Sequence, residues 1–366
     1  MKHRPDERLA TRGGWVELLH GPAALFGGAA RLRGWLYDRR VLPSYDVDVP
    51  VVGVGNLSAG GTGKTPMIAW LARELQGRGL RPGIVSRGYG AADGAPNDEA
   101  TMLAEVLPDV PHVQNPDRVA AALELAGTGI DVVLLDDGFQ HRRLARDVDL
   151  VLVDAQRPFG LPAQSSDGTP LRAFLPRGLM REPLSALRRA AAVVVTRSDS
   201  VDAERLDWLE RTLERAAPGI PILLARHAPT SLRRIEGDGT VESLDLADLA
   251  GLEVDLFSGI GNPEAFRSTV ESLGAEVGEH RVFPDHHAFV PGDLDGLGAV
   301  RPALTTAKDA ARLASTDSDA RPERLLVLDV ELDVVRGRPI LDAILDSLPA
   351  SRAARERASI HEGLHG

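Results

Sequence analysis

The residues best suited to carry chemistry lie in a short glycine-rich stretch that ends in Gly63, Lys64 and Thr65. Glycines let backbone N–H groups point at a polyphosphate, and the N-terminus of a following helix adds a positive dipole end. In loops of this kind the lysine reaches the β- and γ-phosphates and the threonine ligates Mg²⁺. The predicted phosphate-binding residues are Ser58, Ala59, Gly60, Gly61, Thr62, Gly63, Lys64 and Thr65.

The segments on either side of this loop fit the prediction. The apolar run 51–54 is typical of a strand, and a helical pattern follows from 67 to 75. Strand, glycine loop and helix, in that order, are the context that a phosphate-binding loop requires. One residue departs from the usual G-x-x-x-x-G-K-[ST] pattern, because Ser58 stands where its first glycine is expected. The alternative is a glycine-rich turn that ends in Gly-Lys-Thr without binding phosphate.

A second polar cluster follows the apolar run 132–135, which ends in Asp136 and Asp137. This is the form of a segment that places an aspartate beside the Mg²⁺ of a phosphate-binding loop. We therefore predict that one of these two carboxylates binds the metal. Gln140 and His141 follow at the same strand end as candidates to orient water or phosphate, and ordinary loop polarity is the alternative.

Other polar residues also stand at strand ends, where open α/β sheets bind their ligands. Arg87 and Tyr89 follow the strand-like run 83–86, so they are candidate phosphate and substrate contacts. A surface turn would explain them as well. Asp98 opens a helical stretch, where it is either a functional carboxylate or a simple N-cap.

Two further segments carry candidate residues. Arg181 and Glu182 lie in the Pro- and Gly-rich stretch 158–183, which has the composition of a functional loop, although solvated surface charge is the alternative. The run 196–199, Thr-Arg-Ser-Asp, matches the base-reading loop of GTPases only weakly, because the usual lysine is replaced by arginine.

Composition sets limits on the class of protein. The chain has 366 residues, 43% of them hydrophobic and 26% charged, which is ordinary for a globular protein of about two domains. A net charge of −11 argues against a general nucleic-acid binder. There are no cysteines, and hence no disulfide framework. No apolar run reaches the roughly 18 residues of a membrane span, and we see no signal peptide.

The elements that must position these residues alternate between strand and helix. Apolar runs at 149–153, 191–195 and 220–225 continue the series begun at 51–54. Nearly continuous apolar strands separated by helices predict a doubly wound, mostly parallel sheet. A charged, turn-rich stretch follows, and a smaller second α/β domain is expected after it. The expected boundaries are 1–48, 49–225, 226–350 and a mobile tail at 351–366.

The N-terminal segment 15–42 mixes apolar residues with arginines and holds two of the four tryptophans. This pattern suits one or two amphipathic helices, broken near Gly21 and Pro22. Such helices lie in a membrane interface, with tryptophan at headgroup depth and arginine beside anionic lipid. An ordinary helix packed on the core explains the pattern equally well.

Taken in order, these motifs resemble the tetraacyldisaccharide 4′-kinase family of lipid A biosynthesis. The resemblance covers most of the chain and rests on the segments 54–66, 86–90, 98–99, 136–141, 175–183, 196–197 and 283–287. It implies a P-loop core with a second, smaller domain. It also implies ATP- and Mg²⁺-dependent phosphorylation of the 4′-hydroxyl of a tetraacylated disaccharide 1-phosphate, at the cytoplasmic face of the inner membrane.

The resemblance also implies roles for particular residues. Asp98 is expected to be the catalytic base, assisted by His286 of the Asp-His-His run, and Lys64 the catalytic lysine. The expected Mg²⁺ ligands are Thr65, Asp136, Asp137 and Glu182. The expected substrate contacts are Arg87, Tyr89, Gln140, His141 and Arg181. The family's loop Leu-Pro-x-Gly-Pro-Leu-Arg-Glu has Leu179 here in place of its second proline, which leaves the shape of that loop open.

Two other classes of protein compete with the kinase. A P-loop GTPase or ATPase switch, or a metallochaperone-like protein, would share the loop, but such proteins often carry a signature lysine where this chain has Ala59. A membrane-surface binding protein would explain segment 15–42 but not the carboxylates at strand ends. For the kinase we expect a monomer that binds the lipid substrate and the membrane surface, and no nucleic acid.

Overall fold

The computed structural model describes residues 9–10, 13–88, 98–162, 170–236, 239–284, 287–290, 292–314 and 321–348, and of residues 98, 99, 105 and 314 only the backbone. By its internal contacts the chain divides into two compact units. Unit 1 comprises Met1–Tyr89, Leu107–Arg226 and Asp333–Gly366, and unit 2 comprises Gly90–Val106 and His227–Leu332. The chain therefore enters unit 2 twice and returns to unit 1 for its last helix.

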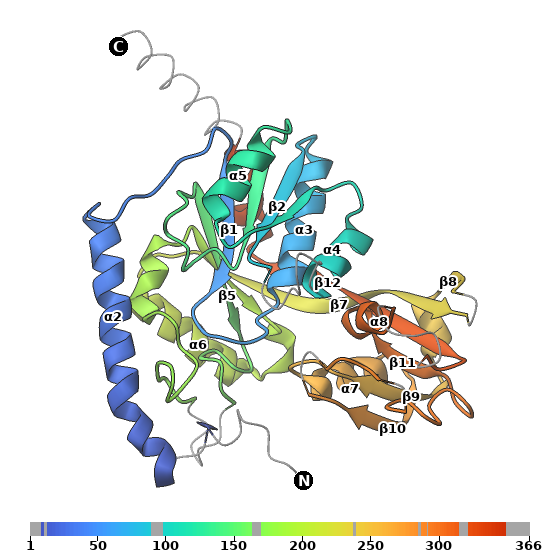
Figure 1. Ribbon diagram of the computed structural model, residues 1–366. Coiled ribbons are helices and arrows are strands. Elements are labelled where there is room, and N and C mark those ends of the chain that lie inside the picture. The colour runs from blue at the N-terminus through green and yellow to red at the C-terminus, as the bar shows by residue number, and fades with distance from the viewer. Residues whose placement is uncertain are drawn as a thin grey trace. The chain divides into compact units, whose positions relative to one another are not determined.

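A parallel sheet forms the centre of unit 1 (Figure 1), with strand order β7-β6-β5-β1-β4-β2-β3. The strands are β1 (Val51–Asn56), β2 (Pro82–Ser86), β3 (His112–Gln114), β4 (Val132–Asp136), β5 (Val148–Asp154), β6 (Ala192–Thr196) and the first part of β7 (Ile222–Ile235). Neighbouring strands pair in parallel, as between Val52 and Val148 of β1 and β5. The predicted doubly wound, mostly parallel α/β fold is confirmed.

Helices cover both faces of this sheet. In α5 (Arg118–Ala126), Val119 and Leu125 pack on one face with Val51 and Val133. Helix α3 (Lys64–Gly77) also contacts β1 and β4 and lies on the other side of them (Figure 1). Unit 1 also contains η2 (Leu184–Arg189), η3 (Ser198–Ser200), α6 (Ala203–Ala216) and α9 (Arg338–Asp346).

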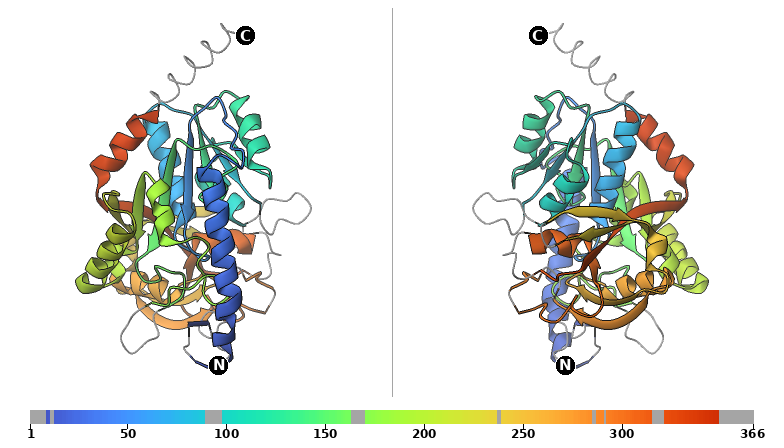
Figure 2. Two further views of the ribbon diagram at one scale, coloured as in Figure 1. Left: turned by 90° about the vertical axis from the view of Figure 1, so that its left-hand side faces the viewer. Right: turned by 90° about the vertical axis from the view of Figure 1, so that its right-hand side faces the viewer.

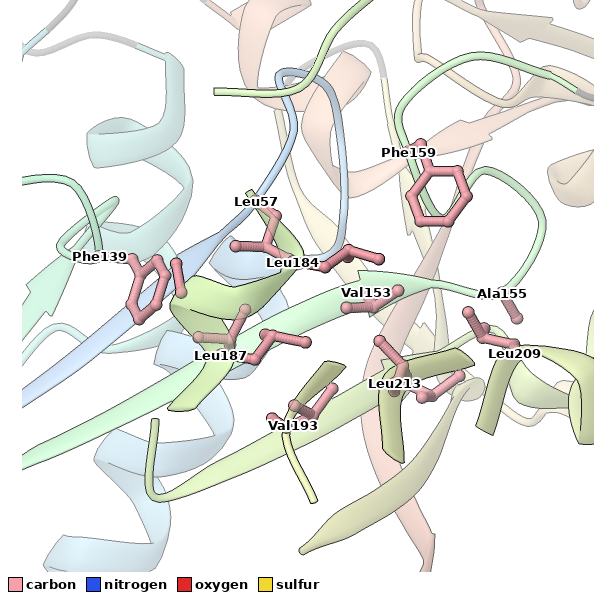
Figure 3. Close-up of a cluster of buried hydrophobic side chains, with 14 of the residues drawn as sticks. Leu57, Phe139, Val153, Ala155, Phe159, Leu184, Leu187, Val193, Leu209 and Leu213 are labelled. Carbon is pink, nitrogen blue, oxygen red and sulfur yellow. The ribbon is translucent and has the colours of Figure 1, made fainter. Parts of the chain in front are cut away.

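One apolar cluster of unit 1 anchors three of the segments that carry site residues. Leu57 follows β1, Phe139 follows β4, and Leu184 and Leu187 belong to η2 (Figure 3). All four side chains are nearly or completely buried. Packing of Leu57 and Phe139 in this cluster therefore anchors the loops after β1 and β4 and limits their freedom to move independently.

The N-terminal helices belong to unit 1. They are η1 (Gly14–Leu19) and α2 (His20–Asp38), and α2 runs along the outside of the unit (Figure 2). Helix α2 buries only its small residues Ala23 and Gly27. Its anchors are Arg142, which donates to the carbonyl of Gly34 at 2.9 Å, and Arg33, which donates to that of Gln140 at 2.7 Å. None of the helices in the described part of the chain combines the length and apolarity needed to cross a membrane.

The strands of unit 2 follow the order β10-β9-β11-β12-β7, and β8 pairs antiparallel with β7. The strands are β8 (Val241–Leu244), β9 (Glu253–Ser258), β10 (Glu276–Val282), β11 (Ala303–Thr306) and β12 (Leu325–Arg336). The helices are α4 (Asp98–Val106), η4 (Leu246–Leu249), α7 (Pro263–Ser272) and α8 (Ala307–Ala314). Helix α7 packs on β10, and α4 packs on α8.

Strand ends differ from expectation where the chain passes between the units. The sequence predicts a strand at 220–225 followed by turns, whereas β7 continues to Ile235. The antiparallel ladder with β8, from Leu232 paired with Leu244 to Ile235 paired with Val241, satisfies its backbone groups. The charged composition of this stretch belongs to a strand with one exposed side, so the prediction of turns was wrong there.

Candidate active site

The loop after β1 has an open, donor-rich shape. Helix α3 begins at Lys64, and its N-cap Gly63 adopts a left-handed conformation with φ 89° and provides no side-chain cap. Gly60 also has a positive φ, 118°, and a Cβ added at Gly60 or Gly61 would meet no atom within 4 Å. A helix N-terminus without a side-chain cap, facing open space, fits a polyphosphate.

Side chains from neighbouring strands hold this loop in shape. Asn56 Nδ2 donates to Thr62 Oγ1 at 3.0 Å, and Thr196 Oγ1 donates to the carbonyl of Thr62 at 2.9 Å. Arg197 donates to the carbonyl of Gly61 at 3.1 Å and pairs with Asp154. Thr196 and Arg197 therefore support the phosphate loop in this structure.

Ser58 and Ala59 pair with the stretch that precedes Arg181. The backbone N–H of Ala59 donates to the carbonyl of Leu179 at 2.8 Å, and Ser58 forms an antiparallel bridge with Met180. Ser58 is almost completely buried. A hydroxyl residue at this place is thus held by backbone pairing and is not directed at solvent.

Three charged side chains meet beside the end of β4. Lys64 Nζ lies 3.5 Å from Asp137 Oδ1, and Arg181 donates to Asp137 Oδ2 at 2.9 Å and to Asp137 Oδ1 at 2.8 Å. Arg181 also donates to the side-chain oxygen of Asn56. Burial raises the pKa of Asp137, but the hydrogen bonds from Arg181 and the charge of Lys64 outweigh it, so that pKa lies well below its usual range. Asp137 is therefore a stable anion between two cations.

Asp136 and Gln140 lie beside this cluster. Asp136 is buried, and its Oδ1 accepts from the backbone N–H of Asp137 at 2.9 Å. Gln140 Nε2 donates to the carbonyl of Asn56 at 2.8 Å, whereas its Oε1 is buried without a hydrogen-bond partner. His141 Nε2 is likewise buried and unpartnered, and burial together with nearby arginines lowers the pKa of His141 to about 4. Gln140 and His141 thus offer neutral polar atoms to a ligand.

Glu182 is held by a neighbouring arginine. Its Oε2 accepts from Arg189 at 2.9 Å, while its Oε1 is buried without a partner. Among the described residues, no group of three or more His, Asp or Glu side chains is placed to hold a metal by itself. A Mg²⁺ site here would therefore share its ligands with the hydroxyl of Thr65 and with phosphate oxygens, as Mg²⁺ sites in phosphoryl-transfer enzymes commonly do.

The remaining predicted residues are placed only in part. Arg87 follows β2. Burial is the main cause that lowers the pKa of Arg118, and the nearby charge of Arg87 lowers it further. Tyr89 and His286 lie outside the described residues. Asp98 is the first residue of α4, but its side chain is outside the description as well.

Sequence reasoning missed several members of the site. Asn56 ends β1, links the phosphate loop to Arg181, and stands within the glycine-rich motif itself. Arg118 lies nearly buried at the start of α5, and its Nε has no hydrogen-bond partner. The charges of Asp136 and Asp137 are close enough to act on the pKa of Arg118. The only signal for Arg118 was its place after Pro-Asp at a helix start, which also suits an ordinary N-terminal turn.

A glycine loop joins a buried strand to a helix without a side-chain cap, a lysine begins that helix, and two aspartates stand at the end of the neighbouring strand. This combination defines a P-loop nucleotide-binding protein. A family model described as tetraacyldisaccharide-1-P 4′-kinase matches residues 15–349. The chain belongs to this tetraacyldisaccharide-1-P 4′-kinase family.

Individual relatives agree with that family. A tetraacyldisaccharide 4′-kinase from Anaeromyxobacter sp. (strain K) is 42% identical over 374 residues, covering 96% of this chain and 94% of the relative. The one from Aeromonas salmonicida is 33% identical over 364 residues, covering 95% and 98%. The crystal structure of "apo" form LpxK from Aquifex aeolicus in complex with ATP matches with a TM-score of 0.68 and 28% identity, over 91% of this chain and 100% of that chain.

Proposed function

We propose that this chain transfers the γ-phosphoryl group of ATP to the 4′-hydroxyl of a tetraacylated glucosamine disaccharide 1-phosphate, a step of lipid A biosynthesis that forms lipid IVA. The observation that carries the proposal is the open N-terminus of α3, flanked by Lys64 and the Asp137–Arg181 pair. Membership of the kinase family supports the tetraacylated disaccharide as the acceptor. The loop 58–65 would hold the triphosphate.

Phosphoryl transfer depends on positioning and on positive charge around the transferring group. Lys64 supplies one cation at the start of α3, and Arg181 supplies a second one close to it through their shared partner Asp137. The half-buried anion Asp137 orients both cations. Thr65 and Asp136 would hold Mg²⁺, with Asp137 and Glu182 as further candidates, and the ion when bound neutralises charge between the β- and γ-phosphates.

The acceptor hydroxyl must lose a proton to a base. We assign that role to Asp98 on the basis of the family resemblance. His286 would raise the proton affinity of Asp98 or relay its proton. Arg87, Tyr89, Gln140, His141 and Arg181 are proposed substrate contacts. The unpartnered buried atoms Gln140 Oε1 and His141 Nε2 support this for two of them, since a ligand would satisfy both.

We further propose that the protein works as a monomer in the cytoplasm, bound to the cytoplasmic surface of the inner membrane through η1 and α2. Large apolar side chains of these helices face solvent: Trp15 is 64% exposed, Leu18 79%, Leu25 78% and Leu32 57%. Arg39 lies over the ring of Trp35 at 5.2 Å, which places a cation beside an exposed aromatic. An apolar surface with neighbouring arginines suits an interface rich in anionic lipid.

A kinase assay tests the function. The purified chain is incubated with the tetraacylated disaccharide 1-phosphate and with ATP or GTP, and phosphorylated lipid is counted. We expect ATP-dependent phosphorylation that falls by roughly 10³-fold in Lys64→Ala and by about 10²- to 10⁴-fold in Asp98→Ala. Asp207→Ala, on the exposed surface of α6, is the matched control and should retain activity. Nucleotide hydrolysis with no phosphorylated lipid would favour a switch protein instead.

Vesicle binding tests the membrane surface separately. In a sedimentation assay with vesicles containing phosphatidylglycerol, the wild type should pellet with the vesicles. A Leu25→Glu/Leu32→Glu double variant should stay in the supernatant. Val300→Glu changes an equally exposed apolar residue in unit 2, 81% exposed, and should leave binding unchanged. Equal loss in both variants would speak against α2 as the contact.

A further inference from the structure

Residues 173–182, which we call the strap, connect the N-terminal helices to the phosphate loop. The strap closes on itself through backbone bonds: the N–H of Gly178 donates to the carbonyl of Phe174 at 2.8 Å, and that of Met180 donates to the carbonyl of Ala173 at 3.1 Å. A Cβ at Gly178 would lie 2.3 Å from the Ala173 oxygen, so the turn has no spare room. Such a turn transmits displacement at one side to the other.

One side of the strap is paired with the phosphate loop. Beyond the bonds at Ser58 and Ala59, the backbone N–H of Arg181 donates to the carbonyl of Leu57 at 2.8 Å, and that of Glu182 reaches the same oxygen at 3.3 Å. The side chain of Arg181 then holds Asp137. The position of the strap therefore fixes the first half of the loop and one of the two cations at the site.

The other side of the strap holds the N-terminal segment. Arg177 is completely buried, and it donates to the carbonyl of Leu9 at 2.6 Å and to Glu17 Oε1 at 3.1 Å. Glu17 in turn accepts from the backbone N–H of Gly13 at 2.9 Å and lies 2.8 Å from His20 Nε2. Arg177 thus contacts the N-terminal segment before η1 and within it, and Glu17 extends the connection to His20 at the start of α2.

A second contact reinforces this side. A Cβ at Gly27 of α2 would lie 2.6 Å from the ring of Phe174, so the helix and the strap touch directly. The guanidinium of Arg31 lies over the same ring, 5.0 Å from its centroid. All of these residues belong to unit 1.

We propose that Arg177 is a positioning residue that couples the N-terminal helices to the phosphate loop through the strap, so that lipid bound by η1 and α2 changes the affinity for ATP. The coupling to lipid rests on the proposed membrane surface, whereas the positioning of the loop does not. Burying a guanidinium is costly unless it is bonded, and the terminal nitrogens of Arg177 donate hydrogen bonds to the N-terminal segment, at Leu9 and Glu17. Linkage requires that ATP change the affinity for lipid by the same factor and in the same direction.

The test measures the dissociation constant of a non-hydrolysable ATP analogue, without and with phosphatidylglycerol vesicles. For the wild type we expect a vesicle-dependent change of about fivefold or more. Arg177→Met should weaken analogue binding in the absence of vesicles and abolish the vesicle-dependent change. Arg172→Met changes an exposed arginine immediately before the strap and should preserve both. Glu17→Gln, which leaves the buried arginine in place, should reduce the coupling even if Arg177→Met does not fold.

The outcomes separate the two proposals. If the vesicles do not bind the wild type, the membrane surface is wrong, and weaker analogue binding by Arg177→Met or Glu17→Gln alone still supports loop positioning. If vesicles bind but neither variant changes the analogue affinity or its dependence on vesicles, the coupling is overturned. Arg177→Lys should recover part of the affinity, because an ammonium retains the charge but not both directed hydrogen bonds.

Discussion

Arg181 grips the carboxylate of Asp137 with both of its terminal nitrogens, at 2.9 and 2.8 Å, while Lys64 approaches the same carboxylate to 3.5 Å. A planar guanidinium makes this two-point contact, and a lysine ammonium cannot. The aspartate after β4 thus sets the positions of two cations at the phosphate loop. Its role in this state is organisation of positive charge.

We expect Arg181→Lys to lower kcat/KM by about 10²-fold, because the ammonium would sit off the bidentate geometry and leave Asp137 free to draw Lys64 closer. Steady-state kinetics with varied ATP measures this loss. Arg188→Lys, an exposed arginine seven residues further along, serves as the control and should retain wild-type rates. Wild-type kcat/KM in Arg181→Lys would remove the bidentate contact from the mechanism.

Gly55 offers a test of packing that the motif alone did not suggest. A Cβ at Gly55 would lie 2.5 Å from the Cβ of Phe139 and 2.8 Å from its backbone nitrogen, whereas one at Gly61 would meet nothing within 4 Å. Gly55→Ala should therefore lower the free energy of unfolding by about 1–3 kcal/mol through overpacking. Gly61→Ala should change it by less than about 1 kcal/mol. Urea denaturation of both variants measures the two free energies of unfolding. Equal values for Gly55→Ala and Gly61→Ala would show that β1 can shift away from Phe139.

The sequence was sufficient for the strands that are buried on both faces. Runs such as 132–135 and 192–195 are apolar throughout, and no other common environment suits them. The sequence was insufficient for residues 226–235, because the exposed side of this strand carries the charged residues that are typical of a loop. It also gave no sign that the segment after Asp333 returns to unit 1, because a return depends on long-range contacts that local patterns do not encode.

Within the site, residues in rigid motifs were predictable and their supports were not. Lys64 and Asp137 follow from loop and strand-end patterns, and the structure places them together. Thr196 attracted attention for a different reason, a weak likeness to a base-reading loop. Its observed hydrogen bond to the Thr62 carbonyl depends on β6 and the phosphate loop being neighbours in space, which single-sequence reasoning does not reveal.

His112 makes the stability of unit 1 depend on pH. Burial lowers the pKa of His112 to about 4 from an ordinary value of 6.5, and its Nε2 lies 2.8 Å from Ser86 Oγ. Between these two values the unfolded chain binds the proton more readily, so stability is complete above about pH 6.5 and falls as the pH is lowered toward 4. The contribution is on the order of 2 kcal/mol.

His112→Gln should remove that part of the pH dependence, because glutamine can still bond Ser86 but does not titrate. Urea midpoints at pH 7.5 and pH 4.5 provide the measurement, and the pH 7.5 value serves as the internal reference. The wild type should lose more stability between the two pH values than the variant does. The same loss in both proteins would place the titrating group elsewhere.

Helix α9 is fastened to the phosphate-loop helix α3 by a network of charges. Asp342 accepts from Arg78 at 2.6 Å and from Arg338 at 3.0 and 3.1 Å, and Glu74 of α3 accepts from the same two arginines at 2.7 and 2.6 Å. Asp346 contributes a single bond to Arg78, at 3.0 Å, from a side chain that is 66% exposed. The two aspartates therefore differ in both the number of partners and the degree of burial.

Asp342→Asn should lower the free energy of unfolding by about 1 kcal/mol, because it removes a charge shared by two arginines, whereas Asp346→Asn should cost less than about 0.5 kcal/mol. Urea denaturation at low and at high salt measures both. The cost of Asp342→Asn should shrink in 1 M salt, where the screening length falls to about 3 Å. A larger effect for Asp346→Asn would mean that the exposed bond, and not the shared carboxylate, fastens α9 to α3.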